Sequence, residues 1–173
     1  MSFMHKNVRL PAFRYRGTRW YFVTLCCAAR RRVFGSPEWA SRIVAHLRAE
    51  ATAYRFAIHA YCAMPDHLHV LARGDEANSD LLAFVKNFNQ KTDHEFRVGF
   101  HRDLWQKKFY DRILRQTDSV ERVAGYIWLN PVRAGICEDP REYPHSGSFT
   151  MDWKKGFAPV EKWVPPWKGK APA

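Results

Sequence analysis

Apolar and polar positions alternate along the chain in blocks that predict strands. The run WYFVTLCCAA (20–29) is rich in β-branched and aromatic residues and predicts a first strand. FAIHAYCAM (56–64) predicts a second strand and HLHVLAR (67–73) a third, joined by a tight turn at Pro65-Asp66. We interpret LWQKKFYDRILR (104–115) as a fourth strand.

Helical spacing of apolar residues appears between and after these strands. One helix is predicted from Ser36, a good N-cap, to about residue 54, and a second from about Ser79. A third opens at Asp118, whose partner Glu121 completes a capping-box pattern, and runs to Pro131. The order β-α-β-β-α-β predicts an α+β, ferredoxin-like fold, with one antiparallel sheet and helices on one face.

Composition divides the chain into a domain and a tail. Residues 1–151 have the length of a single core, and 46% of the chain is hydrophobic. Residues 152–173 are rich in Trp, Pro, Lys and Gly, which predicts an extended C-terminal tail whose tryptophans dock on another surface.

The charge balance indicates a polyanionic partner. The chain has 28 Lys and Arg against 17 Asp and Glu, a net charge of +11. Nucleic acid is the most common partner of such proteins and an anionic membrane surface a rarer one, while a basic surface with no partner is the alternative. The four cysteines form no C-x-x-C pair, and no apolar run approaches the length of a membrane-spanning helix. We therefore expect a cytoplasmic protein that makes no use of a membrane.

Two histidines lie two residues apart in the third predicted strand. Side chains alternate along a strand, so His67 and His69 project to one side, about 7 Å apart along the backbone, and Leu68 to the other. Such a pair can converge on a divalent ion. The alternative is a pair of ordinary surface histidines.

The third predicted helix offers two possible partners for this pair. Tyr126 and Asn130 are four residues apart and share one helix face. An asparagine oxygen is a suitable ligand for a hard cation, and the phenol could reach a group bound to that cation. Alternatively, Tyr126 is a core aromatic and Asn130 only the residue that ends the helix before proline.

Four segments together resemble a known family: MPDHLHVLA, LWQKKFYDRILR, YIWLNPVRAG and YPHSGSF. In this order and spacing they are similar to the REP-associated tyrosine transposases of the HUH nuclease superfamily, over residues 14–150. The resemblance implies a ferredoxin-like core in which His67 and His69 form the HUH motif and Tyr126 is the nucleophile. Asn130 falls where relatives place a polar third metal ligand, although a Gln is common there in the insertion-sequence enzymes.

The resemblance also implies an activity and partners. It implies cleavage and joining of single-stranded hairpin DNA through a 5′-phosphotyrosine, with Mg²⁺ or Mn²⁺ as cofactor, by a monomer or, alternatively, a dimer in the bacterial cytoplasm at the nucleoid. Tyr110, in the basic segment KKFYDR, is a rival nucleophile. Either a non-catalytic hairpin-binding protein or a metal-dependent phosphoesterase would be the competing function. Basic residues that we expect to contact DNA are Arg14, Arg16, Arg30, Arg31, Lys86, Lys91, Lys107, Arg112 and Arg115.

Overall fold

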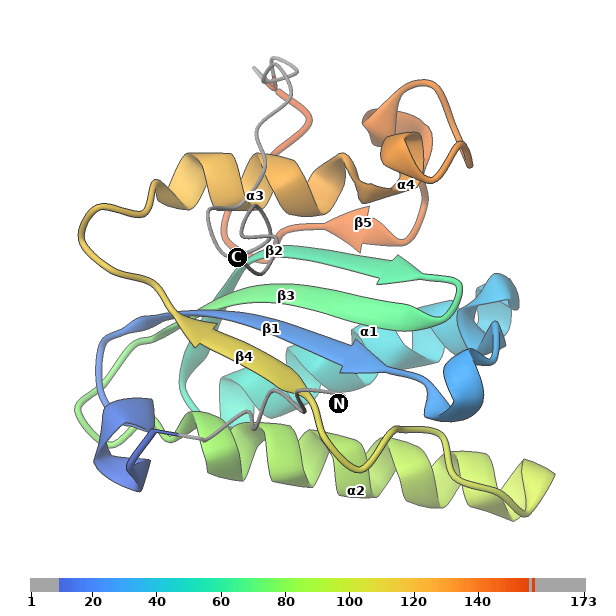
Figure 1. The fold of residues 1–173 in the computed structure, drawn as a ribbon, viewed down its shortest axis with the longest axis horizontal. Helices are drawn as coiled ribbons and strands as arrows, with labels where there is room; N and C mark the ends of the chain where they lie inside the picture. Colours follow the sequence, from blue (N-terminus) through green and yellow to red (C-terminus); the bar gives the residue numbers. More distant parts are fainter. Residues whose placement is uncertain (1–9, 156, 158–173) are drawn as a thin grey trace, which may run out of the picture.

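The computed structural model of the protein describes residues 10–155 and 157 (Figure 1). Five strands form one antiparallel sheet in the order β4-β1-β3-β2-β5. The strands are β1 (Trp20–Cys26), β2 (Phe56–Met64), β3 (His67–Gly74), β4 (Tyr110–Ile113) and β5 (Ser146–Gly147). The α-helices are α1 (Pro37–Ala53), α2 (Leu81–Phe100), α3 (Val120–Trp128) and α4 (Asn130–Arg133).

Helices α1 and α2 cover one face of the sheet, as predicted. Ser36 caps α1 by accepting a hydrogen bond from the backbone N–H of Trp39, and Asp80 caps α2 in the same way. Their apolar residues pack into one core with alternate residues of the strands, among them Ile43, Leu47, Phe84, Phe88, Val23 and Val70. The predicted α+β class and the antiparallel sheet are confirmed.

Helix α3 lies on the opposite face of the sheet, above β2 and β3 in Figure 1, so not all helices share one face as expected. The reason lies in the strands, because β1 and β3 are apolar on both sides. Phe22 and Leu71 project away from α1 and α2 and pack against Tyr126 and Ile127 of α3. Burial of these side chains requires a helix on each face.

Two predicted elements differ from the structure at their ends. The predicted strand 104–115 is a strand only over Tyr110–Ile113. The indole of Trp105 is buried and donates a hydrogen bond to Thr92 of α2 at 2.8 Å, which draws the segment before β4 toward that helix. Helix α3 is capped by Ser119 rather than Asp118, and it ends at Trp128 rather than at Pro131.

The first residues of the predicted tail pack on the domain. Trp153 is buried and stacks on Trp128 with 4.7 Å between ring centroids. This burial agrees with the expectation that tryptophans of the tail dock, while residues 156 and 158–173 of the predicted tail lie outside the described residues. In the described part of the chain, no helix is long and apolar enough to cross a bilayer.

Candidate functional site

The two histidines of β3 meet above the sheet on the side of α3. The Nε2 atoms of His67 and His69 lie 3.0 Å apart. His69 is 4% exposed, and the side chain of His67 is 14% exposed. The structure therefore brings the two imidazoles together on one side of β3, as the alternation of side chains along a strand predicts, while the ion they would hold stays a prediction.

Each imidazole is oriented through its other ring nitrogen. Nδ1 of His67 donates to the carboxylate of Asp66 at 2.6 Å, and Nδ1 of His69 is hydrogen-bonded to the Thr24 hydroxyl at 2.8 Å. Thr24 lies directly opposite His69 in the pairing of β1 with β3. Protein metal sites fix their histidine ligands by such outer contacts, which direct the second nitrogen toward the ion.

A cavity of about 370 Å³ opens over this pair and includes Asn130. The amide nitrogen of Asn130 donates to the backbone carbonyls of Tyr126 and Ile127, at 3.1 and 3.2 Å. Its amide oxygen is therefore the atom that Asn130 can offer to a cation. The amide oxygen is the kind of donor that Mg²⁺ and Mn²⁺ prefer, and the two imidazoles are donors for divalent transition metals, so the set as a whole fits Mn²⁺ better than Mg²⁺. Within the described residues, no three His, Cys, Asp or Glu side chains form a group that could bind a metal.

Tyr126 of α3 lies beside the histidines. Its ring centroid is 6.3 Å from that of His69, and the residue is 7% exposed. The guanidinium of Arg133 lies over the ring, 4.0 Å from its centroid, and donates to the Tyr126 carbonyl at 2.7 Å. A cation over an aromatic ring is a favourable contact, so Arg133 helps to hold the ring of Tyr126 in place. Tyr126 is thus a core aromatic and also a neighbour of the histidine pair.

Tyr110 of β4 lines the cavity over the histidines, which the sequence alone did not indicate, whereas Tyr126 is not among the lining residues. Its ring packs against Phe22, with 6.2 Å between centroids. Burial raises the pKa of the Tyr110 phenol above its usual value, which disfavours the phenolate form. Tyr110 therefore remains a rival of Tyr126 by position and is less suited to be a nucleophile.

Among the predicted DNA-binding residues, Arg30 is the one that lines the cavity over the histidines. It forms a salt bridge of 3.0 Å with Asp66, the same carboxylate that orients His67. Ala29 and Arg30 both have left-handed backbone conformations, with φ of 53° each. Residues other than glycine rarely adopt this conformation. The turn at Ala29 and Arg30 therefore sets the direction in which the Arg30 side chain leaves the backbone.

The other basic candidates divide into three groups by their place in the fold. Lys107, Arg112 and Arg115 lie along or next to β4, near Tyr110. Lys86 and Lys91 lie on α2, across the sheet from the histidines, and Lys91 forms an ion pair with the buried Glu50. The rest lie near other elements: Arg16 pairs with Asp80, Arg31 donates to the carbonyl of Asp103, and Arg14 lies over the ring of Phe13.

Sequence reasoning missed the partners of the two histidines. Thr24 is the one Ser or Thr of β1 and lies between the apolar Val23 and Leu25, so its polarity was a usable signal. Asp66 was interpreted only as part of a turn, although a carboxylate next to a histidine can orient it.

Residues 18–129 match the protein family described as "Transposase IS200 like". The chain belongs to the IS200-like transposase family. The matched range contains His67, His69 and Tyr126 and ends one residue before Asn130.

Two relatives extend this finding. A REP-associated tyrosine transposase of Escherichia coli is 24% identical over 106 residues, which span 61% of this chain and 62% of the relative. A Haemophilus influenzae relative assigned to the same group is 26% identical over 155 residues, 83% of this chain and 86% of the relative. The resemblance noted from the sequence motifs of this IS200-like transposase is confirmed.

A solved structure shares the fold. It is the structure of a REP-associated tyrosine transposase bound to a REP hairpin, with a TM-score of 0.70 and 21% identity. The match covers 94% of the IS200-like transposase described here and 92% of the solved chain.

Proposed function

We propose that this IS200-like transposase cuts and rejoins single-stranded hairpin DNA, with Tyr126 as the nucleophile. The observation that supports the proposal most is the meeting of the oriented His67–His69 pair with Tyr126 within one chain. Because one chain supplies both parts, we propose that a monomer is active. The hairpin as substrate is supported by the solved neighbour, which was bound to a REP hairpin.

The proposed reaction is a transesterification at a phosphodiester. The phenol loses its proton, and its oxygen forms a bond to the phosphorus of the DNA strand. The bond from phosphorus to the 3′-oxygen breaks, and that oxygen takes up a proton as a 3′-hydroxyl. One phosphate ester bond breaks and another forms, to the tyrosine oxygen. A second 3′-hydroxyl can therefore attack the 5′-phosphotyrosine in the reverse reaction and join two strands.

Each residue of the site has a distinct part in this proposal. His67, His69 and Asn130 would hold Mg²⁺ or Mn²⁺. When bound, the ion would polarise a phosphate oxygen and favour departure of the 3′-oxygen. A free phenol has a pKa of about 10, so little of it is ionised at neutral pH. Arg133, which lies over the ring of Tyr126 and donates to its backbone carbonyl, would hold the phenol beside the histidine pair.

Two other functions use the same surface without this nucleophile. A hairpin-binding protein would need the basic residues alone, and a metal-dependent phosphoesterase would use water. Neither gives a reason for a tyrosine packed beside the histidine pair under an arginine. The formation of a covalent protein–DNA product separates the three functions.

The test uses a labelled hairpin oligonucleotide with Mn²⁺ and a denaturing gel. We expect the unmodified protein to form a covalent adduct. Tyr126→Phe should lose the adduct, by at least about 100-fold, because only the nucleophilic oxygen is removed, and it should still bind the hairpin. Tyr110→Phe is the matched control and should still form the adduct.

The remaining outcomes assign the other functions. An adduct with Tyr126→Phe but none with Tyr110→Phe would transfer the nucleophile to Tyr110. Cleavage by the unmodified protein without any adduct would indicate a phosphoesterase. Binding without cleavage would indicate a hairpin-binding protein.

A further inference from the structure

Another cavity, of about 420 Å³, lies where the start of α1 meets the end of α2. The two helices run antiparallel, so these ends lie together on the face of the sheet that the helices cover (Figure 1). Three arginines and three aromatic residues line most of it, namely Arg31, Arg32, Arg102, Trp39, Phe96 and Phe100. We call it the α1–α2 groove. It shares no lining residue with the cavity over His67 and His69, the histidine cavity.

Aromatic side chains form the apolar part of the α1–α2 groove. Phe96 is buried, and its ring centroid lies 5.0 Å from that of Trp39. Phe100, the last residue of α2, is 44% exposed although it stacks on Phe96. Exposed apolar surface inside a concavity with a charged rim is typical of a site that another molecule covers.

The arginines give this groove a positive charge that the protein does not neutralise. Arg32 and Arg102 are exposed, and neither they nor Arg31 form an ion pair with a carboxylate in the part of the chain that the structure describes. Arg31 donates to a backbone carbonyl instead, which holds its guanidinium at the groove. The one carboxylate that lines the groove, Glu38, is paired with Arg42 at 2.8 Å. Guanidinium groups next to apolar surface suit a ligand that has both carboxylates and an apolar group.

The rings of the α1–α2 groove are poorly placed to stack on a nucleobase. Phe100 stacks on Phe96, with 4.6 Å between ring centroids. The guanidinium of Arg102 lies over the ring of Phe100, and that of Arg42 lies over the ring of Trp39. A base needs an open ring face, whereas an aliphatic side chain also packs against ring edges. The groove therefore favours a peptide over a strand of nucleic acid.

We propose that the α1–α2 groove docks an acidic segment of a protein partner. An aliphatic side chain of the segment, such as that of leucine, would pack between Trp39 and Phe100. Carboxylates on either side of it would pair with Arg31, Arg32 and Arg102. Because the lining residues of the histidine cavity are different ones, a partner bound in this way would leave that cavity open to DNA.

The test begins with selection of peptides from a random display library on the full chain. Peptides that also bind a variant with both Arg32→Ala and Arg102→Ala are removed, and the remaining sequences are read. We expect these sequences to place carboxylates on both sides of a leucine, isoleucine or methionine. A labelled peptide of the selected sequence is then synthesised, and its affinity is measured by fluorescence anisotropy.

Variants of the protein and of the peptide locate the contacts. Arg32→Ala combined with Arg102→Ala should weaken peptide binding by about tenfold or more, because hydrogen bonds between charged groups are lost. Phe100→Ser should weaken it similarly, since the aliphatic side chain loses its apolar wall. Two changes in the peptide, carboxylates to amides and the aliphatic residue to serine, should have the same effect.

Two variants are matched controls. Lys154→Ala combined with Lys155→Ala removes the same charge outside the groove. Val98→Ser removes an apolar side chain from the last turn of α2 that is 68% exposed and does not line the groove. Both should bind the peptide as tightly as the unmodified protein. A melting curve for each variant confirms that the fold is intact.

Three outcomes would overturn the proposal. The first is that no peptide is enriched against the Arg32→Ala, Arg102→Ala variant. The second is equal affinity of the selected peptide for Phe100→Ser and for the unmodified protein. The third is that no peptide binds while Phe100→Ser loses self-association or binding of single-stranded DNA, which would assign the groove to a second copy of the chain or to DNA. No substitution lies in the histidine cavity, so the outcome is independent of adduct formation by Tyr126.

Discussion

Each histidine of the site has one nitrogen engaged by the protein and the other directed to its neighbour. Asp66 and Thr24 hold the two Nδ1 atoms, and the two Nε2 atoms lie 3.0 Å apart. At that distance one Nε2 can carry a proton that the other accepts, so the pair is stable without an ion. Binding of a cation to both Nε2 atoms would move that proton to Nδ1 of His69, which would then donate to the Thr24 hydroxyl.

A substitution of Asp66 tests whether its carboxylate orients His67 for metal binding. Asp66→Asn keeps the size of the side chain but removes the charge that favours a proton on Nδ1 of His67 and makes Nε2 a better ligand. We expect the affinity for Mn²⁺ to fall about 10- to 100-fold, as found for outer-contact changes in metal sites. Calorimetric titration of the protein with Mn²⁺ in the absence of DNA measures it.

Asp75→Asn is the matched control, because Asp75 pairs with Arg73 at the surface, at 3.2 Å. Its affinity for Mn²⁺ should equal that of the unmodified protein. Equal affinity in Asp66→Asn as well would mean that the carboxylate does not support the ligand, and the proposed role of Asp66 would be wrong.

Some residues of the site could be predicted from the sequence, namely those that the repeat of a single strand or helix places side by side. Alternation along a strand puts His67 and His69 on one side, and the helical repeat puts Asn130 one turn after Tyr126. Thr24 could not be found in this way, because its contact with His69 depends on the register between β1 and β3. Tyr110 likewise reaches the cavity only through the pairing of β4 with β1.

At the scale of elements, helix α3 carries Tyr126, the proposed nucleophile, and three contacts position α3. Ser119 caps its first turn, and Trp128 near its end donates from its indole to the carbonyl of Gly147 at 3.0 Å. Trp128 also stacks on Trp153. Because α3 is only nine residues long, it depends on such contacts more than on its own propensity.

The cap of α3 is a specific test of that dependence. Ser119→Ala removes the acceptor for the backbone N–H of Arg122, now at 3.2 Å, and we expect a loss of about 1 kcal/mol in the free energy of unfolding. Ser119→Asp should retain the stability, since aspartate caps as well as serine. Urea denaturation followed by tryptophan fluorescence measures both variants. If Ser119→Ala is as stable as the unmodified protein, the cap does not support α3.

The order of strands and helices in the sequence did not predict which face of the sheet α3 covers. The β-α-β-β-α-β order accounts for α1 and α2, and α3 comes after it. The usable signal was that β1 has apolar residues at both odd and even positions, as in Tyr21, Phe22 and Val23. The predicted strand 104–115 was too long because Trp105 packs toward α2. Its contact with Thr92 joins residues 13 apart in the chain, and no local pattern shows it.

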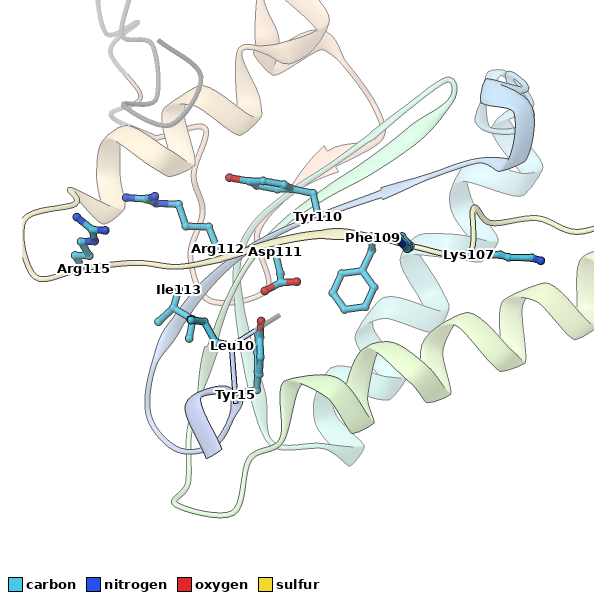
Figure 2. Close-up of a pocket in the computed structure, with 10 residues that line it drawn as sticks. Leu10, Tyr15, Lys107, Phe109, Tyr110, Asp111, Arg112, Ile113 and Arg115 are labelled. Atoms are coloured by element: carbon cyan, nitrogen blue, oxygen red, sulfur yellow. The ribbon is translucent and has the colours of Figure 1, made fainter. Parts of the chain in front are cut away.

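At the scale of the whole molecule, the basic residues behind the net charge of +11 differ in their surroundings: some pair with carboxylates, and others line concave surfaces. Arg16, Arg42 and Arg97 form ion pairs with carboxylates, as does Lys91. The cavity along β4, lined by Lys107, Lys108, Arg112 and Arg115 (Figure 2), and the rim of the histidine cavity, where Arg30 lies, combine basic side chains with a concave surface. Charge in a concave surface attracts a polyanion more strongly than the same charge on a flat one.

This distribution predicts how DNA binding depends on salt. Affinity for a hairpin should fall with salt, with a log–log slope of about −0.7 for each phosphate contacted in single-stranded DNA and about −0.9 for each in duplex. Contacts with phosphates alone would give the same affinity for any sequence. Base-edge contacts and stacking release no counterions, so the preference for the hairpin over a scrambled strand should persist at every salt concentration. Titration of Tyr126→Phe with both DNAs, from low to moderate salt, separates the two contributions. Equal affinities throughout would leave a nonspecific basic surface, and hairpin recognition by this protein would be excluded.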